Sequence, residues 1–171
     1  MVKAKTSKRE IFKLDDRTRN LYALMSQTHD TIRSANELEL DQYGVNEAQT
    51  RILFMLTQEK KGMTLNEMSR WILRKFNSIS TLVNRMEKKG LVKKSKNLSN
   101  GKVYIVMTPK GSELFERINE RAIYLIFTVL SEEEKKELHS MLKRLRIEGR
   151  KLLGLDFKPP FLPEAAEISP R

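Results

Sequence analysis

The fold is decided between residues 62 and 111, which read GMTLNEMSRWILRKFNSISTLVNRMEKKGLVKKSKNLSNGKVYIVMTPKG. Apolar residues recur at steps of three and four over about Phe76–Lys89, which predicts an amphipathic helix there. Two strand-like runs follow at Leu91–Lys96 and Lys102–Met107, the second of them rich in β-branched residues. Asn100-Gly101 lies between them, and both residue types accept the positive φ angles of a tight turn. The stretch therefore predicts a helix followed by a β-hairpin.

Capping signals divide the rest of the chain into helices. Three capping boxes are present, formed by Asn46 with Gln49, Thr64 with Glu67, and Ser131 with Glu134. Thr108 and Pro109 suit the start of another helix, with proline in its first turn. Outside the hairpin region the predicted helices are Arg17–Leu40, Asn46 to the break at Lys60-Lys61-Gly62, one that starts at Thr64, one continuous helix from Pro109 to Leu130, and Ser131 to about Gly154.

The order helix, helix, helix, helix, hairpin, helix, helix predicts a mainly α protein with a small antiparallel β wing. Three helices before a hairpin is the plan of the winged helix-turn-helix. The chain is predicted to consist of a basic flexible arm at residues 1–11, a single domain at 12–155 and a Pro-rich tail at 156–171. Within the domain, dimerisation helices at about 12–40 and 112–155 flank a winged helix-turn-helix at about 45–111.

The positive charge is concentrated in one part of the chain. The 171 residues carry a formal net charge of +11. Residues 57–107 hold twelve Lys/Arg and three Asp/Glu, a net +9. Such a local excess indicates one basic face on one module and therefore a polyanionic partner.

Several classes of site are excluded by composition. There is no cysteine, which rules out disulfides, thiolate metal sites and thiol redox sensing. His29 and His139 have no partner at metal-ligand spacing. No phosphate loop, nucleophile elbow or carboxylate constellation is present, so we expect neither an enzyme nor a cofactor. The longest apolar run, residues 122–130, is too short to span a bilayer and the start is no secretory signal, so a soluble cytoplasmic protein is expected.

The outer face of the predicted 76–89 helix carries the candidate DNA contacts. Its residues are short hydrogen-bonding side chains and cations, the types that contact base edges and phosphates. A polar outer face is also what any soluble helix has, but one richer in Ser, Thr and Asn than in Glu is a poor choice for helix propensity alone. With the residue before the helix and the wing cation, the candidate DNA-binding residues are Lys75, Asn77, Ser78, Ser80, Thr81, Asn84, Arg85, Lys88 and Lys102.

Three segments within residues 62–111 resemble the multiple antibiotic resistance regulator (MarR) family. They are Thr64-Leu65-Asn66-Glu67-Met68-Ser69, the run from Ile79 to Val92, and Met107-Thr108-Pro109-Lys110-Gly111. Tyr43-Gly44-Val45 and the flanking helices also resemble the family, so the resemblance covers most of residues 12–153. It implies a homodimer that represses or activates genes from near-palindromic duplex DNA sites. It also implies a response to a small organic effector, often aromatic and anionic.

The sequence departs from the family pattern in two places. The family's wing usually carries an Asp-x-Arg pair, whereas this turn reads Ser99-Asn100-Gly101-Lys102, which keeps a cation and has no acidic brace. Leu73-Arg74-Lys75-Phe76 stands where the family has a glycine and a capping serine before the recognition helix.

Some features have two interpretations. Trp71 and Phe76 fit either core packing or the lining of a ligand pocket, and the basic arm fits either minor-groove insertion or solvated disorder. The whole chain fits one rival function, a winged-helix module that binds protein partners without specific DNA binding. That rival does not explain the excess of cations in residues 57–107. Peripheral membrane binding is a third possible function, and it would need exposed large apolar residues beside the cations.

Overall fold

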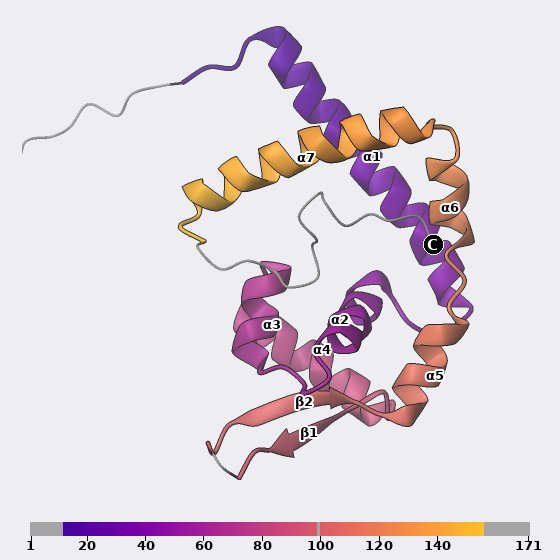
Figure 1. Ribbon diagram of the computed structural model, residues 1–171, viewed down its shortest axis with the longest axis vertical. Coiled ribbons are helices and arrows are strands. Elements are labelled where there is room, and N and C mark those ends of the chain that lie inside the picture. The colour runs from indigo at the N-terminus through magenta and orange to yellow at the C-terminus, as the bar shows by residue number, and fades with distance from the viewer. Residues whose placement is uncertain (1–11, 99, 156–171) are drawn as a thin grey trace, which may run out of the picture.

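The computed structural model describes residues 12–98 and 100–155, so the predicted arm and Pro-rich tail lie outside the described residues. Its elements are α1 Asp16–Asp41, α2 Glu47–Gln58, α3 Leu65–Ile72, α4 Phe76–Lys88, β1 Val92–Lys96, β2 Val103–Met107, α5 Pro109–Arg117, α6 Arg121–Phe127 and α7 Glu132–Leu152. Figure 1 shows α2 to α5 and the hairpin gathered at one end, with α1 and α7 as long rods at the other. The mainly α class with a small antiparallel wing is confirmed.

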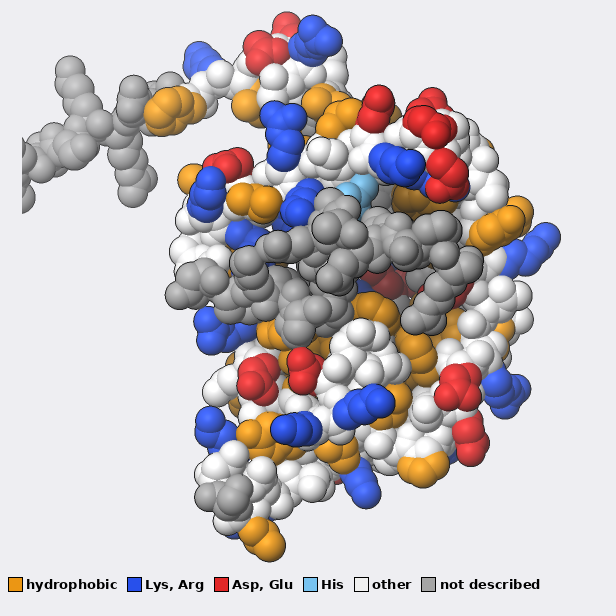
Figure 2. Space-filling view, in the orientation of Figure 1, with side chains coloured by type: hydrophobic (Ala, Val, Ile, Leu, Met, Phe, Trp, Pro, Cys, Tyr) orange, Lys and Arg blue, Asp and Glu red, His pale blue; other side chains and the backbone are white. Residues whose placement is uncertain are grey.

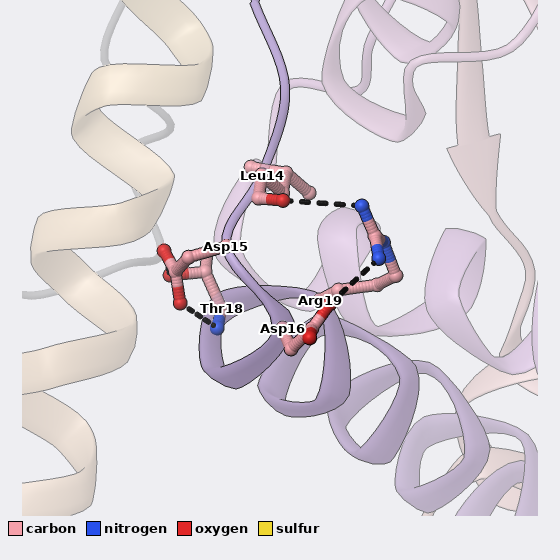
Figure 3. Close-up of polar contacts among 5 residues, drawn as sticks. All are labelled: Leu14, Asp15, Asp16, Thr18 and Arg19. Atoms are coloured by element: carbon pink, nitrogen blue, oxygen red, sulfur yellow. Dashed lines mark hydrogen bonds and ion pairs between the residues drawn. The ribbon is translucent and has the colours of Figure 1, made fainter.

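Side-chain caps stand at the starts of several helices. The Asp15 carboxylate accepts hydrogen bonds from the backbone N–H and the hydroxyl of Thr18, at 2.9 and 2.7 Å, and so caps α1 (Figure 3). These hydrogen bonds favour the charged carboxylate and lower the pKa of Asp15. Beside this cap, Arg19 donates to the side chain of Asp16 and to the carbonyl of Leu14. All three capping boxes predicted from the sequence are present, at the starts of α2, α3 and α7.

The prediction of one continuous helix from Pro109 to Leu130 is wrong. The structure ends α5 at Arg117, gives Ile118 an extended backbone with ψ 121°, and starts α6 at Arg121. The apolar period runs through this break, so periodicity alone gave no sign of it.

Two side chains near the end of α1 bind the chain at this break. The Tyr43 hydroxyl accepts from the backbone N–H of Asn119 at 3.1 Å, and the Glu39 carboxylate accepts from that of Ala122 at 2.7 Å. The N–H groups at a helix start have no partner within the helix, and side-chain oxygens from elsewhere can satisfy them. Both contacts span more than 70 residues of sequence, which is why a local pattern did not predict the break.

One hydrophobic core lies in the winged-helix end. Each of α2, α3, α4 and the hairpin contributes buried side chains, whereas α6 and α7 have none. Trp71 packs against this core, so the packing interpretation holds for that residue. The fully buried side chains of largest volume are Leu40, Ile52, Leu53, Met68, Ile79, Val83, Met86, Val92 and Ile105.

The hairpin is antiparallel, with Val92 paired to Met107 at its base and Lys96 to Val103 near the turn. In the middle of β2, Ile105 pairs with Lys94 and also exchanges backbone hydrogen bonds with Met63, at 2.7 and 3.0 Å, which joins the wing to the segment before α3. The wing is therefore anchored on both sides, by its own ladder and by this bridge.

Candidate nucleic-acid interface

The buried stripe of α4 fixes which residues face outward. Ile79, Val83 and Met86 are fully buried, so the opposite side of the helix is left to solvent. Asn77, Ser78, Thr81, Asn84, Arg85 and Lys88 are exposed, as are Lys75 just before the helix and Lys102 on the wing, whereas Ser80 is half-buried at the edge of the face. The positions 77, 81, 84 and 88 follow steps of four, three and four and so form one stripe along the helix. The structure thus brings the predicted α4 residues together on one open surface.

The turn of the wing is braced by an amide. The side-chain oxygen of Asn100 accepts from the backbone N–H of Lys102 at 3.0 Å, and its NH2 group donates to the Tyr104 hydroxyl at 3.2 Å. Across the turn, the N–H of Asn97 donates to the Lys102 carbonyl at 2.8 Å. The turn sequence holds no acidic residue, and Asn100 holds the backbone of Lys102 instead. Asparagine in turns commonly bonds backbone two residues on, and this was the signal available in the sequence.

Lys94 connects the wing to the outer face of α4, and it is not among the candidate residues predicted from the sequence. Its ammonium donates to Asn84 Oδ1 at 2.8 Å and to Glu87 Oε2 at 2.7 Å. Its backbone N–H donates to Glu87 Oε1 at 3.3 Å. The hydrogen bond from the Lys94 side chain lowers the pKa of Glu87, with a smaller contribution from the lysine charge. Strand alternation predicts which side of β1 a lysine faces but gives no partner on another element, so sequence alone could not find this cluster.

Most carboxylates of the basic segment are already engaged. Glu87 is paired with Lys94, and Glu67 accepts from the backbone N–H and hydroxyl of Thr64 at 2.7 and 2.8 Å. By contrast, Arg85 and Lys102 are exposed and have no side-chain hydrogen bond or ion pair within residues 12–98 and 100–155. The net positive charge of this segment is therefore available to an external anion.

The segment before α4 has neither the glycine nor the capping serine that the family pattern has at this point. Leu73 takes the left-handed conformation, with φ 56° and ψ 40°, at the C-cap of α3. Lys75 is the N-cap residue of α4 and makes no side-chain capping hydrogen bond. Phe76 is 46% exposed and lines a groove of about 490 Å³ between the start of α3 and the wing. Phe76 therefore lines a groove and is not part of the hydrophobic core.

A second hollow lies at the other end of α4. It has a volume of about 500 Å³ and lies between the α1–α2 loop, the C-terminal end of α4 and α5. Its lining includes the aromatic ring of Tyr43, one carboxylate, Glu113, and the aliphatic side chains of Val45 and Leu91. Four cations also line it: Lys88, Lys89, Lys110 and Arg117. The hollow combines apolar surface with an excess of positive charge.

Neither a metal-binding cluster nor a membrane-spanning helix is found in the described part of the chain. Residues 12–98 and 100–155 contain no group of three or more His, Asp or Glu arranged to hold a metal ion. No helix in these ranges has the length and apolar character needed to cross a membrane.

The sequence and the fold of this chain are both similar to those of known proteins. Residues 45–104 match the model of the MarR family, whereas no curated protein sequence matches the chain. The ligand-free organohalide-sensing regulator RdhR-CbdbA1625 superposes with a TM-score of 0.71 at 26% identity, over 96% of this chain and 98% of that chain.

Two further structures support the fold alone, because their identities are lower. AbsC, a MarR family transcriptional regulator from Streptomyces coelicolor, has a TM-score of 0.72 at 20% identity over 82% of this chain and 99% of that chain. MepR of S. aureus, solved as a complex with DNA, has a TM-score of 0.65 at 20% identity over 78% of this chain and 99% of that chain.

Proposed function

We propose that the chain, whose residues 45–104 match the model of the MarR family, is a transcriptional regulator that binds specific sequences of duplex DNA. The observation that carries the proposal is the exposed face of α4, where Asn77, Thr81, Asn84 and Lys88 form one stripe beside a braced basic wing. An α-helix fits the major groove of duplex DNA, and short polar side chains on its outer face can reach base edges there. The MepR complex with DNA supports the proposal through a shared fold.

The proposal assigns different roles to helix and wing. Thr81 and Asn84 contact base edges, while Arg85, Lys88 and Lys102 contact phosphates. Loss of a base contact costs about 1–3 kcal/mol on the cognate site and leaves nonspecific binding nearly intact. Loss of a phosphate contact weakens binding to all sequences and lowers the salt slope by about one unit per contact.

The test is a fluorescence titration across a salt series, with a duplex enriched from a random pool and a random duplex. Asn84→Ala should lose affinity mainly for the enriched duplex. Lys102→Ala should lose affinity for both and reduce the salt slope by about two units in a dimer. Lys136→Ala removes the same charge from α7, away from the proposed DNA-binding surface, and serves as the control. An unchanged slope for Lys102→Ala would show that the wing does not contact DNA, and absence of duplex binding would favour the rival protein-binding module.

We further propose that the regulator acts as a homodimer on a near-palindromic site. α7 has no buried residue in its 21 positions, and α1 buries only Leu40. The exposed large apolar residues on α1, α6 and α7 are Leu21, Tyr22, Leu24, Met25, Leu38, Tyr124, Leu125, Phe127, Met141, Leu142, Leu145, Ile147 and Leu152. Figure 2 shows hydrophobic side chains reaching the surface around the upper helices. Contiguous patches of this kind on monomers are rarely larger than a few hundred Å² and usually mark an interface.

Sedimentation tests the dimer. The wild type should sediment at twice the 20.0 kDa of one chain. Leu145→Glu places a charge on a side chain of α7 that is 56% exposed in one chain, and should shift the equilibrium to monomer. Leu98→Glu makes the same change on the wing, where the side chain is 94% exposed, and should leave the dimer intact. A wild type that sediments only as one chain would contradict the dimer.

We also propose that a small aromatic anion regulates DNA binding from the hollow between α4 and α5. Lys110 and Arg117 attract the anionic group, Tyr43 offers a ring for stacking, and the aliphatic lining accepts the apolar part. The RdhR-CbdbA1625 regulator, 26% identical, has been solved with 2,4-dichlorophenol bound. Calorimetric titration with 2,4-dichlorophenol and with benzoate should show binding that Arg117→Ala weakens. Binding of equal strength to that variant would place the effector elsewhere.

A further inference from the structure

We propose that Lys94 determines the base preference of Asn84 by holding its amide oxygen, so that the recognition helix reads guanine in preference to adenine at that position. The inference rests on the proposed function, since it concerns how the α4 face reads DNA. It assigns a positioning role to a residue that contacts no base.

The geometry ties one end of the Asn84 amide to the wing. Lys94 Nζ lies 2.8 Å from Asn84 Oδ1, a charge-assisted hydrogen bond at ordinary length. The oxygen and the NH2 group of an amide lie on opposite sides of the carbonyl carbon. With the oxygen turned to Lys94, the NH2 group is the part of Asn84 directed away from the wing.

Lys94 is itself held at two points. Its ammonium lies 2.7 Å from Glu87 Oε2, and its backbone N–H lies 3.3 Å from Glu87 Oε1. Glu87 stands three residues after Asn84, so both are on neighbouring positions of one helix face. The carboxylate thus fixes the strand and the ammonium together, and the lysine is not a free cation that swings to a phosphate.

The consequence for base reading follows from the hydrogen-bonding groups on the bases. Asparagine usually pairs with adenine in a bidentate way, accepting from N6 and donating to N7. That mode needs the amide oxygen directed at the base. An Asn84 that presents only its two N–H donors is matched by guanine, whose major-groove edge carries two acceptors, N7 and O6.

The experiment is selection of bound sequences from a random duplex pool by the full chain. The position read by Asn84 is identified as the one whose preference disappears in Asn84→Ala. There the wild type should favour guanine over adenine, and Lys94→Met should shift the ratio toward adenine by about fivefold or more, the discrimination of a bidentate pair. Lys96→Met removes an equal charge from the same side of β1, two residues further on, and should leave the ratio unchanged. Lys94→Arg keeps a donor and should restore the wild-type preference.

The outcomes separate this inference from the proposed function. If the wild type enriches no sequence, the proposed function fails and the inference with it. If the wild type enriches a site in which the position read by Asn84 is adenine, or if Lys94→Met leaves the ratio unchanged, only the inference fails. The wild-type preference at the position that Asn84→Ala identifies decides between guanine and adenine, so the test does not depend on the folding of any Lys94 variant.

Discussion

Replacing Gly111 with alanine should destabilise the protein, because this glycine lies where α5 leaves the wing. A Cβ built on Gly111 would lie 2.1 Å from the backbone oxygen of Leu91 and 3.0 Å from Cγ of Met107. Backbone cannot yield as a flexible side chain does, so α5 has to move away from Leu91. The same Leu91 oxygen accepts from the N–H of Thr108 at 3.1 Å, and that hydrogen bond would be strained.

The size of the effect can be estimated from these contacts. Overpacking costs about 1–3 kcal/mol, and weakening one backbone hydrogen bond costs up to about 1 kcal/mol. Alanine is favoured over glycine in a helix by about 1 kcal/mol, which offsets part of the loss. We therefore expect Gly111→Ala to lower the free energy of unfolding by about 1–3 kcal/mol.

The assay is urea denaturation followed by circular dichroism at one fixed protein concentration. Gly149→Ala is the matched control, because Gly149 is also within a helix and a Cβ there meets nothing within 4 Å. It should raise the free energy of unfolding by about 0.5–1 kcal/mol, the opposite sign. If both variants were stabilised equally, the close approach of Gly111 to Leu91 would not exist in solution.

Three further substitutions test local contacts. Glu39→Ala removes the acceptor for the Ala122 N–H and should lower the free energy of unfolding by about 1–2 kcal/mol, with a weaker helical circular dichroism signal. An unchanged free energy of unfolding would mean that this hydrogen bond does not stabilise the start of α6. Leu73→Gly relieves the left-handed backbone and should stabilise by about 0.5–1 kcal/mol in the same assay, whereas a loss would show that the Leu73 side chain matters more than its φ of 56°. Because the Lys94 hydrogen bond lowers the pKa of Glu87 below 4.5, that contact stabilises above about pH 4.5 and is lost as the pH falls through the lowered value. The stability gap between wild type and Glu87→Gln should close in acid, and a gap that persists at about pH 2 would refute the ion pair.

The winged helix was predictable because its signals are local. A capping box spans four residues, the buried stripe of α4 repeats within one helix, and an Asn-Gly turn needs only its neighbours. The residues Ile79, Val83 and Met86 that define the buried side of α4 also define the candidate DNA face opposite to it. Short-range rules were therefore enough to predict the elements of the winged helix and which residues of α4 face outward.

What sequence reasoning missed depends on contacts between distant residues. The break after α5 is held by Glu39 and Tyr43, and no property of residues 118–122 alone requires it. Lys94 is one of several lysines in a basic run, and only its position beside α4 separates it from the others. The left-handed Leu73 keeps the helix-turn-helix geometry without glycine, which a pattern that expects glycine cannot anticipate.

The break between α5 and α6 has a consequence for operator choice. Glu39 and Tyr43 join the end of α1 to the start of α6, whereas α5 stays with the winged helix. In a dimer built from α1, α6 and α7, the angle at this elbow sets how far apart the two recognition helices lie. We then expect half-site spacing to depend on Glu39 and Tyr43, and base preference to depend on the outer face of α4 and on Lys94 beside it. In the proposed dimer, substitutions at this elbow are expected to change the spacing of the two half-sites while the residues of α4 stay the same.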